Sequence, residues 1–366
     1  ICANILVAAG DYANAAELLQ QAREGIVGPV TSHFAAVIEM NQAWLAHRQG
    51  CLAQRDELLR EALRSANDDR SRMRLRWYEN ALSELLPVAL TQGIEPDTAR
   101  NLAREFAVRP APLDIEEWPW PIRIYTLGRF GVVLRDKPLS FQRKTPRRLI
   151  GLLKVLVSLG GRDVPEQKLI DTLWPDEEGD AAQHALTAAL HRLRRLLGDT
   201  HALRVEDGSV SLNRERVWID ALEAERVFAV AEGALSRADQ ATFDQAVKTL
   251  GVLYRGQFLP ADTDAPWSVS MRERLKARFV QIVTDYGEQL ECSARWDEAA
   301  DWYRRGLAAD DLSESFYQGL MRCYLETGRC AEGMSVFRRM RQILSVTLGI
   351  QPSPRSDALH RSLQSR

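Results

Sequence analysis

The clearest hydrophobic pattern in the chain lies between Asp180 and Gly198. Four leucines recur there at spacings of four, three and four residues: Leu186, Leu190, Leu193 and Leu197. Because an α-helix turns once every 3.6 residues, this spacing places the leucines on one buried stripe. Asp180 and Gln183 fit a capping box, and Gly198 fits a helix stop. The pattern therefore predicts one amphipathic helix over 180–197.

Two shorter helices are predicted before this one. The first has Thr145 as its cap and Pro146 at the first helical position, and a glycine pair ends it. Its core stripe is formed by Leu149, Leu152, Leu153 and Leu156. The second helix is expected to start at Asp163, to carry Glu166 in its first turn and to end at Trp174-Pro175. Short connections between three such helices favour a trihelical core.

Strand-like segments flank the three helices. Residues 122–127 and 130–134 are rich in β-branched and aromatic side chains, and an Asp136-Lys137 turn follows them. After the third helix, 203–206 and 209–212 flank Asp207-Gly208, a strong two-residue hairpin signal. A small sheet, three helices and a final hairpin together predict a winged helix.

The face of helix 180–197 opposite the leucines is small and polar first and rich in arginine later. Its members and flanking residues are His184, Thr187, Ala188, His191, Arg192, Arg194 and Arg195. Short side chains allow a close approach to base edges, and arginines suit guanine or phosphate. We therefore interpret these residues as candidate contacts with the DNA major groove. A solvated face of an ordinary helix is the alternative.

Two further groups of cations are candidate DNA contacts. At the start of the first helix, phosphate contact and a solvated charged turn are equally good interpretations of Arg143, Lys144, Arg147 and Arg148. Around the hairpin, contact with the backbone or minor groove is the interpretation of Arg204, Arg214 and Arg216. Glu206 and Asp207 at the hairpin tip oppose this second interpretation.

Helical repeats are expected on both sides of the winged helix. Residues 1–108 have helical patterns throughout, and 109–121 is a linker rich in proline and tryptophan. Several positions from Trp296 recur 34 residues later, from Cys330, which is the period of tetratricopeptide repeats. The predicted domains are thus 1–108, 109–121, 122–220 and 221–366. The predicted fold class is mostly α, with tetratricopeptide-like repeats flanking a small α+β winged helix.

The net charge of the whole chain indicates no nucleic-acid partner, but the charge of the predicted winged helix alone does. The formal net charge of the 366 residues is −2, but 121–220 hold 17 Lys and Arg against 13 Asp and Glu. Five scattered cysteines indicate free thiols and a cytoplasmic location, and no apolar run suggests a membrane span. No phosphate-binding loop, nucleophile motif or metal-ligand spacing occurs, so we expect no catalysis, no cofactor and no metal.

The combination of TPRRLIGLLKVLVSLGG, LIDTLWPD, LHRLRRLLGD and the wing resembles the winged helix of OmpR-type response regulators. Residues 221–366, with LYRGQFLP at 253–260, resemble the bacterial transcriptional activator domain that follows this winged helix in SARP-type activators. Residues 1–108 are similar to the arms of large MalT-like regulators, so we expect the chain to be the C-terminal part of a longer protein. Whether the rest is a nucleotide-dependent switch stays open.

This resemblance implies a transcriptional activator that reads promoter DNA with helix 180–197 and the wing. The partners it implies are double-stranded promoter DNA, RNA polymerase and, as an open alternative, a second copy of the chain. The helical repeats would couple signals or mediate these protein contacts. A different class of function also fits the sequence: a helical-repeat scaffold whose winged helix contacts protein instead of DNA. Salt-dependent binding to duplex DNA distinguishes the two classes.

Overall fold

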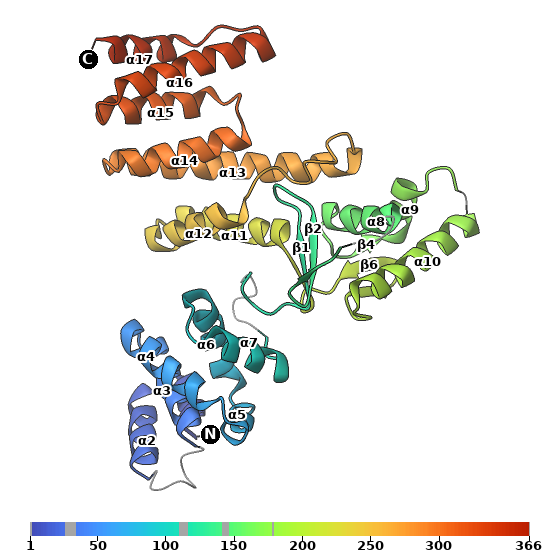
Figure 1. Ribbon diagram of the computed structural model, residues 1–366, viewed down its shortest axis with the longest axis vertical. Helices are drawn as coiled ribbons and strands as arrows, with labels where there is room; N and C mark the ends of the chain where they lie inside the picture. The colour runs from blue at the N-terminus through green and yellow to red at the C-terminus, as the bar shows by residue number, and fades with distance from the viewer. Residues whose placement is uncertain (1, 26–33, 110–115, 141–145, 178, 366) are drawn as a thin grey trace. The chain divides into compact units, whose positions relative to one another are not determined.

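The computed structural model describes residues 2–25, 34–109, 116–140, 146–177 and 179–365 (Figure 1). Tertiary contacts divide the chain into two compact units, 1–121 and 122–366. The boundary falls at the end of the predicted linker. Arg143, Lys144 and Thr145 lie outside the described residues, and so does the helix cap that we predicted at Thr145.

The first unit consists of helices that pack as antiparallel neighbours. They are α1 (Cys2–Ala9), α2 (Tyr12–Glu24), α3 (Ala35–Arg48), α4 (Leu52–Ser65), α5 (Asp69–Leu75), α6 (Glu79–Gln92) and α7 (Pro96–Glu105). Gly10 and Gly50 both adopt positive φ, at 84° and 75°, in the turns that join α1 to α2 and α3 to α4. Glycine adopts this conformation at little cost, so the turns mark two equivalent helical hairpins.

The second unit begins with the strands and short helices that were predicted as a winged helix. Its strands are β1 (Ile122–Tyr125), β2 (Gly131–Leu134), β3 (Lys137–Pro138), β4 (Val164–Pro165), β5 (Leu203–Glu206), β6 (Ser209–Leu212) and β7 (Val217–Ile219). One sheet has the order β3-β2-β1-β7, with β1 antiparallel to β2 and parallel to β7. The other has the order β4-β6-β5 and contains the wing. Asp207 and Gly208 have φ of 49° and 70°, as a tight hairpin turn requires.

Three helices lie between the strands: α8 (Arg147–Ser158), α9 (Glu166–Leu173) and α10 (Gly179–Leu197). The predicted leucine stripe of α10 is confirmed, because all four leucines are buried. The predicted capping box is wrong, because α10 begins at Gly179 and Asp180 therefore lies inside the helix. Gln183 Nε2 donates to Glu166 Oε2 at 2.6 Å. The predicted helix start at Asp163 is also wrong. Its carboxylate accepts from the Ser211 hydroxyl at 3.1 Å, so β4 pairs with the wing before α9 begins at Glu166.

The remaining helices form stacked hairpins. They are α11 (Asp220–Ser236), α12 (Gln240–Leu253), α13 (Pro266–Cys292), α14 (Trp296–Ala309), α15 (Glu314–Glu326), α16 (Cys330–Ile343), a π-helical turn η2 (Leu344–Leu348) and α17 (Pro354–Gln364). Helices α14 and α16 start 34 residues apart, as the sequence repeat predicts. Tyr303 and Phe337, which hold the same position in the two repeats, are both buried.

The winged helix and the following hairpins are joined through a buried carboxylate. Asp220, the first residue of α11, accepts hydrogen bonds from the backbone N–H groups of Thr126, Leu127 and Ala221 and from the Thr126 hydroxyl, at 2.7–2.9 Å. Nearby, Leu259 N donates to Thr126 O and Gly128 N donates to Gln257 O, which extends the contact beyond β1. The end of β1 is therefore bonded both to α11 and to the segment before α13.

Burial raises the pKa of Asp220 to about 6. In the unfolded chain the ordinary value is 3.8. Between these values the native state binds a proton that the unfolded state lacks, so the free energy of unfolding falls as the pH rises from about 4 to about 6. We expect Asp220→Asn, which cannot titrate, to lose this part of the pH dependence. Urea denaturation of both proteins between pH 4 and pH 7 measures it, and superimposable profiles would contradict the assignment.

Candidate nucleic-acid interface

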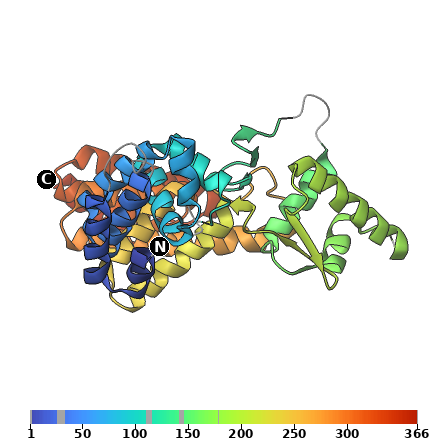
Figure 2. The same cartoon turned by 90° about the horizontal axis from the view of Figure 1, so that it is seen from below.

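Helix α10 presents a continuous polar surface on the side opposite its leucines. The residues of this surface that are exposed are His184, Thr187, His191, Arg192 and Arg195, whereas Ala188 is half-buried. Figures 1 and 2 place α10 at the end of the second unit that lies away from α14–α17. We call the five exposed residues, which are His184, Thr187, His191, Arg192 and Arg195, the α10 face. Its charge comes from Arg192 and Arg195 near the C-terminal end, where cations also interact favourably with the helix dipole.

Arg194 does not belong to this face. It is half-buried, and its guanidinium donates to Leu203 O at 3.3 and 3.4 Å. Since Leu203 is the first residue of β5, this contact ties the end of α10 to the base of the wing. The position of Arg194 supports a role in orienting the wing relative to α10.

The wing arginines also differ in whether they are free to contact DNA or are bonded within the protein. Arg204 on β5 is exposed. Arg214 forms an ion pair with the buried Glu223 of α11, and Arg216 Nε lies 3.1 Å from Asp199 Oδ2. Both side chains retain partial exposure, and each is paired with a carboxylate within the protein, with Glu223 shared between Arg214 and Arg226. Of the three predicted wing contacts, Arg204 is the one that forms no ion pair with a carboxylate among the described residues.

Arg147 and Arg148 are exposed at the start of α8. The candidate contacts that are exposed on α10 and β5 are His184, Thr187, His191, Arg192, Arg195 and Arg204. The bond between Gln183 and Glu166, which the sequence did not indicate, fixes α10 against α9 at its N-terminal end.

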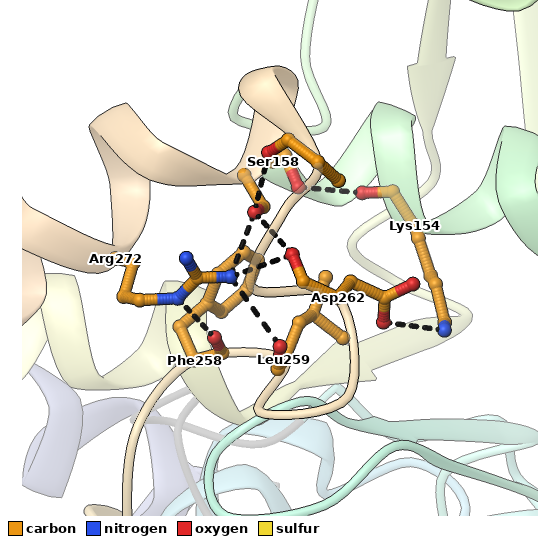
Figure 3. Close-up of polar contacts among 8 residues, drawn as sticks. Lys154, Ser158, Phe258, Leu259, Asp262 and Arg272 are labelled. Carbon is orange, nitrogen blue, oxygen red and sulfur yellow. Dashed lines mark hydrogen bonds and ion pairs between the residues drawn. The ribbon is translucent and has the colours of Figure 1, made fainter.

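A second polar cluster lies where α8 of the winged helix meets the segment that precedes α13 (Figure 3). Lys154 Nζ of α8 lies 2.6 Å from Asp262 Oδ2. Arg272 of α13 donates to the carbonyls of Phe258, Leu259, Asp262 and Thr263 and to Ser268 Oγ. Phe258 and Leu259 belong to the LYRGQFLP segment noted in the sequence, but the cluster itself was not predicted, because Lys154 and Asp262 are 108 residues apart in the chain.

Across the described residues, no group of three His, Cys, Asp or Glu side chains is arranged to hold a metal ion. Nor does any described helix combine the length and apolar character needed to cross a membrane.

Residues 219–364 match the family model of the bacterial transcriptional activator domain. Two curated relatives are both regulatory proteins named AfsR, from Streptomyces griseus and from Streptomyces coelicolor. Each is 28% identical to this chain, over 206 and 207 residues respectively, which is 56% of the chain. The chain spans about one fifth of their length, 21% and 20%.

A solved structure of Mycobacterium tuberculosis EmbR in complex with a low-affinity phosphopeptide has a similar fold, with a TM-score of 0.51 and 19% identity. The similarity covers 67% of this chain and 65% of EmbR. It confirms the predicted fold class, helical repeats around a small winged helix. Together with the domain match and the AfsR relatives, it confirms the resemblance to SARP-type transcriptional activators.

Proposed function

We propose that this chain is the promoter-binding part of a SARP-type transcriptional activator. The observation that carries the proposal is the α10 face, an exposed set of hydrogen-bonding and cationic side chains on a helix whose other side is fixed by buried leucines. Such a helix fits the width of the DNA major groove. Arg204 on the adjacent wing supplies a cation for the neighbouring phosphates or minor groove.

The contacts divide by chemistry. We assign Arg195 and His191 to base edges, because around the helix they lie on the side opposite the buried leucines. Arg192, at the flank of that side, is assigned to phosphate. Arg194, Arg214 and Arg216 act indirectly in this proposal, since their bonds to Leu203, Glu223 and Asp199 hold the wing and its flanks.

Arg195→Ala is expected to weaken binding to a selected duplex about tenfold or more and to relax the preference at one base pair. The reason is that a bidentate base contact discriminates between base pairs, whereas a phosphate contact does not. The measurement is fluorescence anisotropy on duplexes selected from random fragments, at salt concentrations between 50 and 200 mM. Arg338→Ala is the matched control, because it removes an exposed arginine from α16, far along the chain.

Equal affinities of wild type and Arg195→Ala for the selected duplex would remove Arg195 from the interface. Absence of any salt-dependent duplex binding by the wild type would overturn the whole proposal and favour the scaffold function.

We assign protein contacts to α13–α17. Several of their exposed arginines pair with nearby carboxylates, as in Arg295–Glu298, Arg304–Asp301 and Arg329–Glu332. A surface with balanced charge suits protein partners such as RNA polymerase or a second copy of the chain better than it suits DNA. Residues 1–108 are proposed to couple a signal to this part, as stacked helical hairpins present broad surfaces for binding.

A further inference from the structure

A cavity of about 510 Å³ lies between the four-stranded sheet and α8. Phe130, Val132 and Ile150 supply its apolar lining, and Asp262 closes one side. Its volume falls within the range of small-molecule sites in proteins. Among the described residues, neither the α10 face nor Arg204 lines it, whereas Arg147, a candidate phosphate contact in the sequence, does. The apolar part of the lining therefore calls for a separate explanation.

Two cations of α8 line the same cavity. Arg147 and Lys154 are seven residues apart, which places them two turns apart on one side of the helix, with Ile150 between them. Lys154 Nζ lies 4.7 Å from the centre of the Phe130 ring and gives one of its three N–H donors to Asp262. Within the described residues Arg147 has no hydrogen-bond or ion-pair partner. The lining therefore carries one positive charge more than Asp262 neutralises.

The wall formed by Asp262 is held rigidly. Its carbonyl accepts from Arg272 Nη2 at 2.9 Å, and its N–H donates to Leu259 O at 2.9 Å (Figure 3). Arg272 is itself buried. Because Asp262 belongs to the activator domain and α8 to the winged helix, a molecule in the cavity touches both.

We propose that this cavity binds a small amphipathic carboxylate. Its single negative charge neutralises the excess positive charge, with the carboxylate between Arg147 and the free donors of Lys154. Its apolar body packs on Phe130, Val132 and Ile150. A monoanion satisfies both halves of the lining, whereas a neutral molecule leaves the excess cation without a partner. Such a ligand bridges the winged helix and the activator domain and stabilises their contact.

Isothermal titration of the full chain with octanoate tests the proposal, with 1-octanol and octylamine as probes of the same length and different charge. Octanoate is expected to bind at least tenfold more tightly than the other two. Affinity is expected to rise about fourfold per methylene from hexanoate to octanoate. Arg147→Gln is expected to weaken octanoate binding about tenfold. Its neighbour Arg148→Gln is the matched control, because Arg148 is also exposed but is not among the residues that line the cavity.

Three results would overturn the proposal: no binding of octanoate, equal binding of octanoate and 1-octanol, or equal losses in the two arginine variants. Arg147 lies on the surface, so its replacement is not expected to unfold the protein, and circular dichroism of each variant verifies this. The measurement contains no DNA. Its outcome is therefore independent of the promoter-binding proposal.

Discussion

Asp220→Ala is expected to lower the free energy of unfolding of residues 122–366 by about 3–5 kcal/mol. The Asp220 side chain is buried, with 3% of the residue exposed. It is the acceptor for three backbone N–H groups and for the Thr126 hydroxyl. Alanine leaves these donors buried without an acceptor and also leaves a small cavity. Because the donors come from the end of β1 and the start of α11, both elements lose their common anchor.

Hydrogen exchange detected by mass spectrometry measures this effect locally. Protection is expected to fall in peptides that cover β1 and the start of α11. Asp239→Ala is the matched control, since Asp239 caps the next helix, α12, by accepting from Thr242 N at 3.1 Å but lies at the surface. Its replacement is expected to cost much less, with the change confined to α12. Equal losses in the two variants would refute the role of burial in this argument.

Arg272→Met is expected to destabilise the same unit by a similar amount, about 3–5 kcal/mol. The guanidinium of Arg272 satisfies four backbone carbonyls in the segment that joins α12 to α13, and also Ser268 Oγ in the first turn of α13. Methionine retains the apolar stem but removes every donor. The carbonyls of Phe258 and Thr263 lose the donor that the described contacts give them, whereas those of Leu259 and Asp262 keep other donors. The unpaired carbonyls account for the loss. Because Asp262 is in this segment, its ion pair with Lys154 is also expected to weaken.

Arg274→Met provides the control for Arg272→Met. Arg274 is on the same helix and pairs with Glu225 at 2.7 Å, but its side chain is 47% exposed. An exposed pair of this kind contributes at most about 1 kcal/mol. Thermal denaturation followed by circular dichroism compares the two variants. Similar melting temperatures for both would show that the carbonyl contacts of Arg272 contribute little.

The sequence by itself determined the elements of the winged helix. Leucine spacing located α10, because a helix that buries one side must repeat apolar residues every three or four positions. Asp207-Gly208 located the wing, because a tight hairpin turn requires residues that tolerate positive φ. The 34-residue repeat located α14 and α16, because each repeat must bury an equivalent surface against its neighbours. All three signals are local or periodic.

The tertiary structure alone decided how the cations on these elements are used. The sequence pattern placed Arg194 at the flank of the α10 face as a candidate phosphate contact, like Arg192, whereas the structure bonds it to Leu203 O. The pattern likewise gave equal weight to Arg204 and to Arg214, which forms an ion pair with the buried Glu223. An arginine side chain reaches partners several ångströms from its own helix face, so its position on the helix does not fix its role.

The connection between the winged helix and the activator domain was also decided by the tertiary structure. Asp220 bonds to Thr126, 94 residues earlier in the chain, and Lys154 bonds to Asp262, 108 residues later. Neither pair belongs to a periodic pattern. A buried polar group is stable only when folding brings it a partner, and that partner's place in the sequence depends on the path of the whole chain. Hydrophobic spacing therefore determined which elements form, and chain topology determined which polar residues meet.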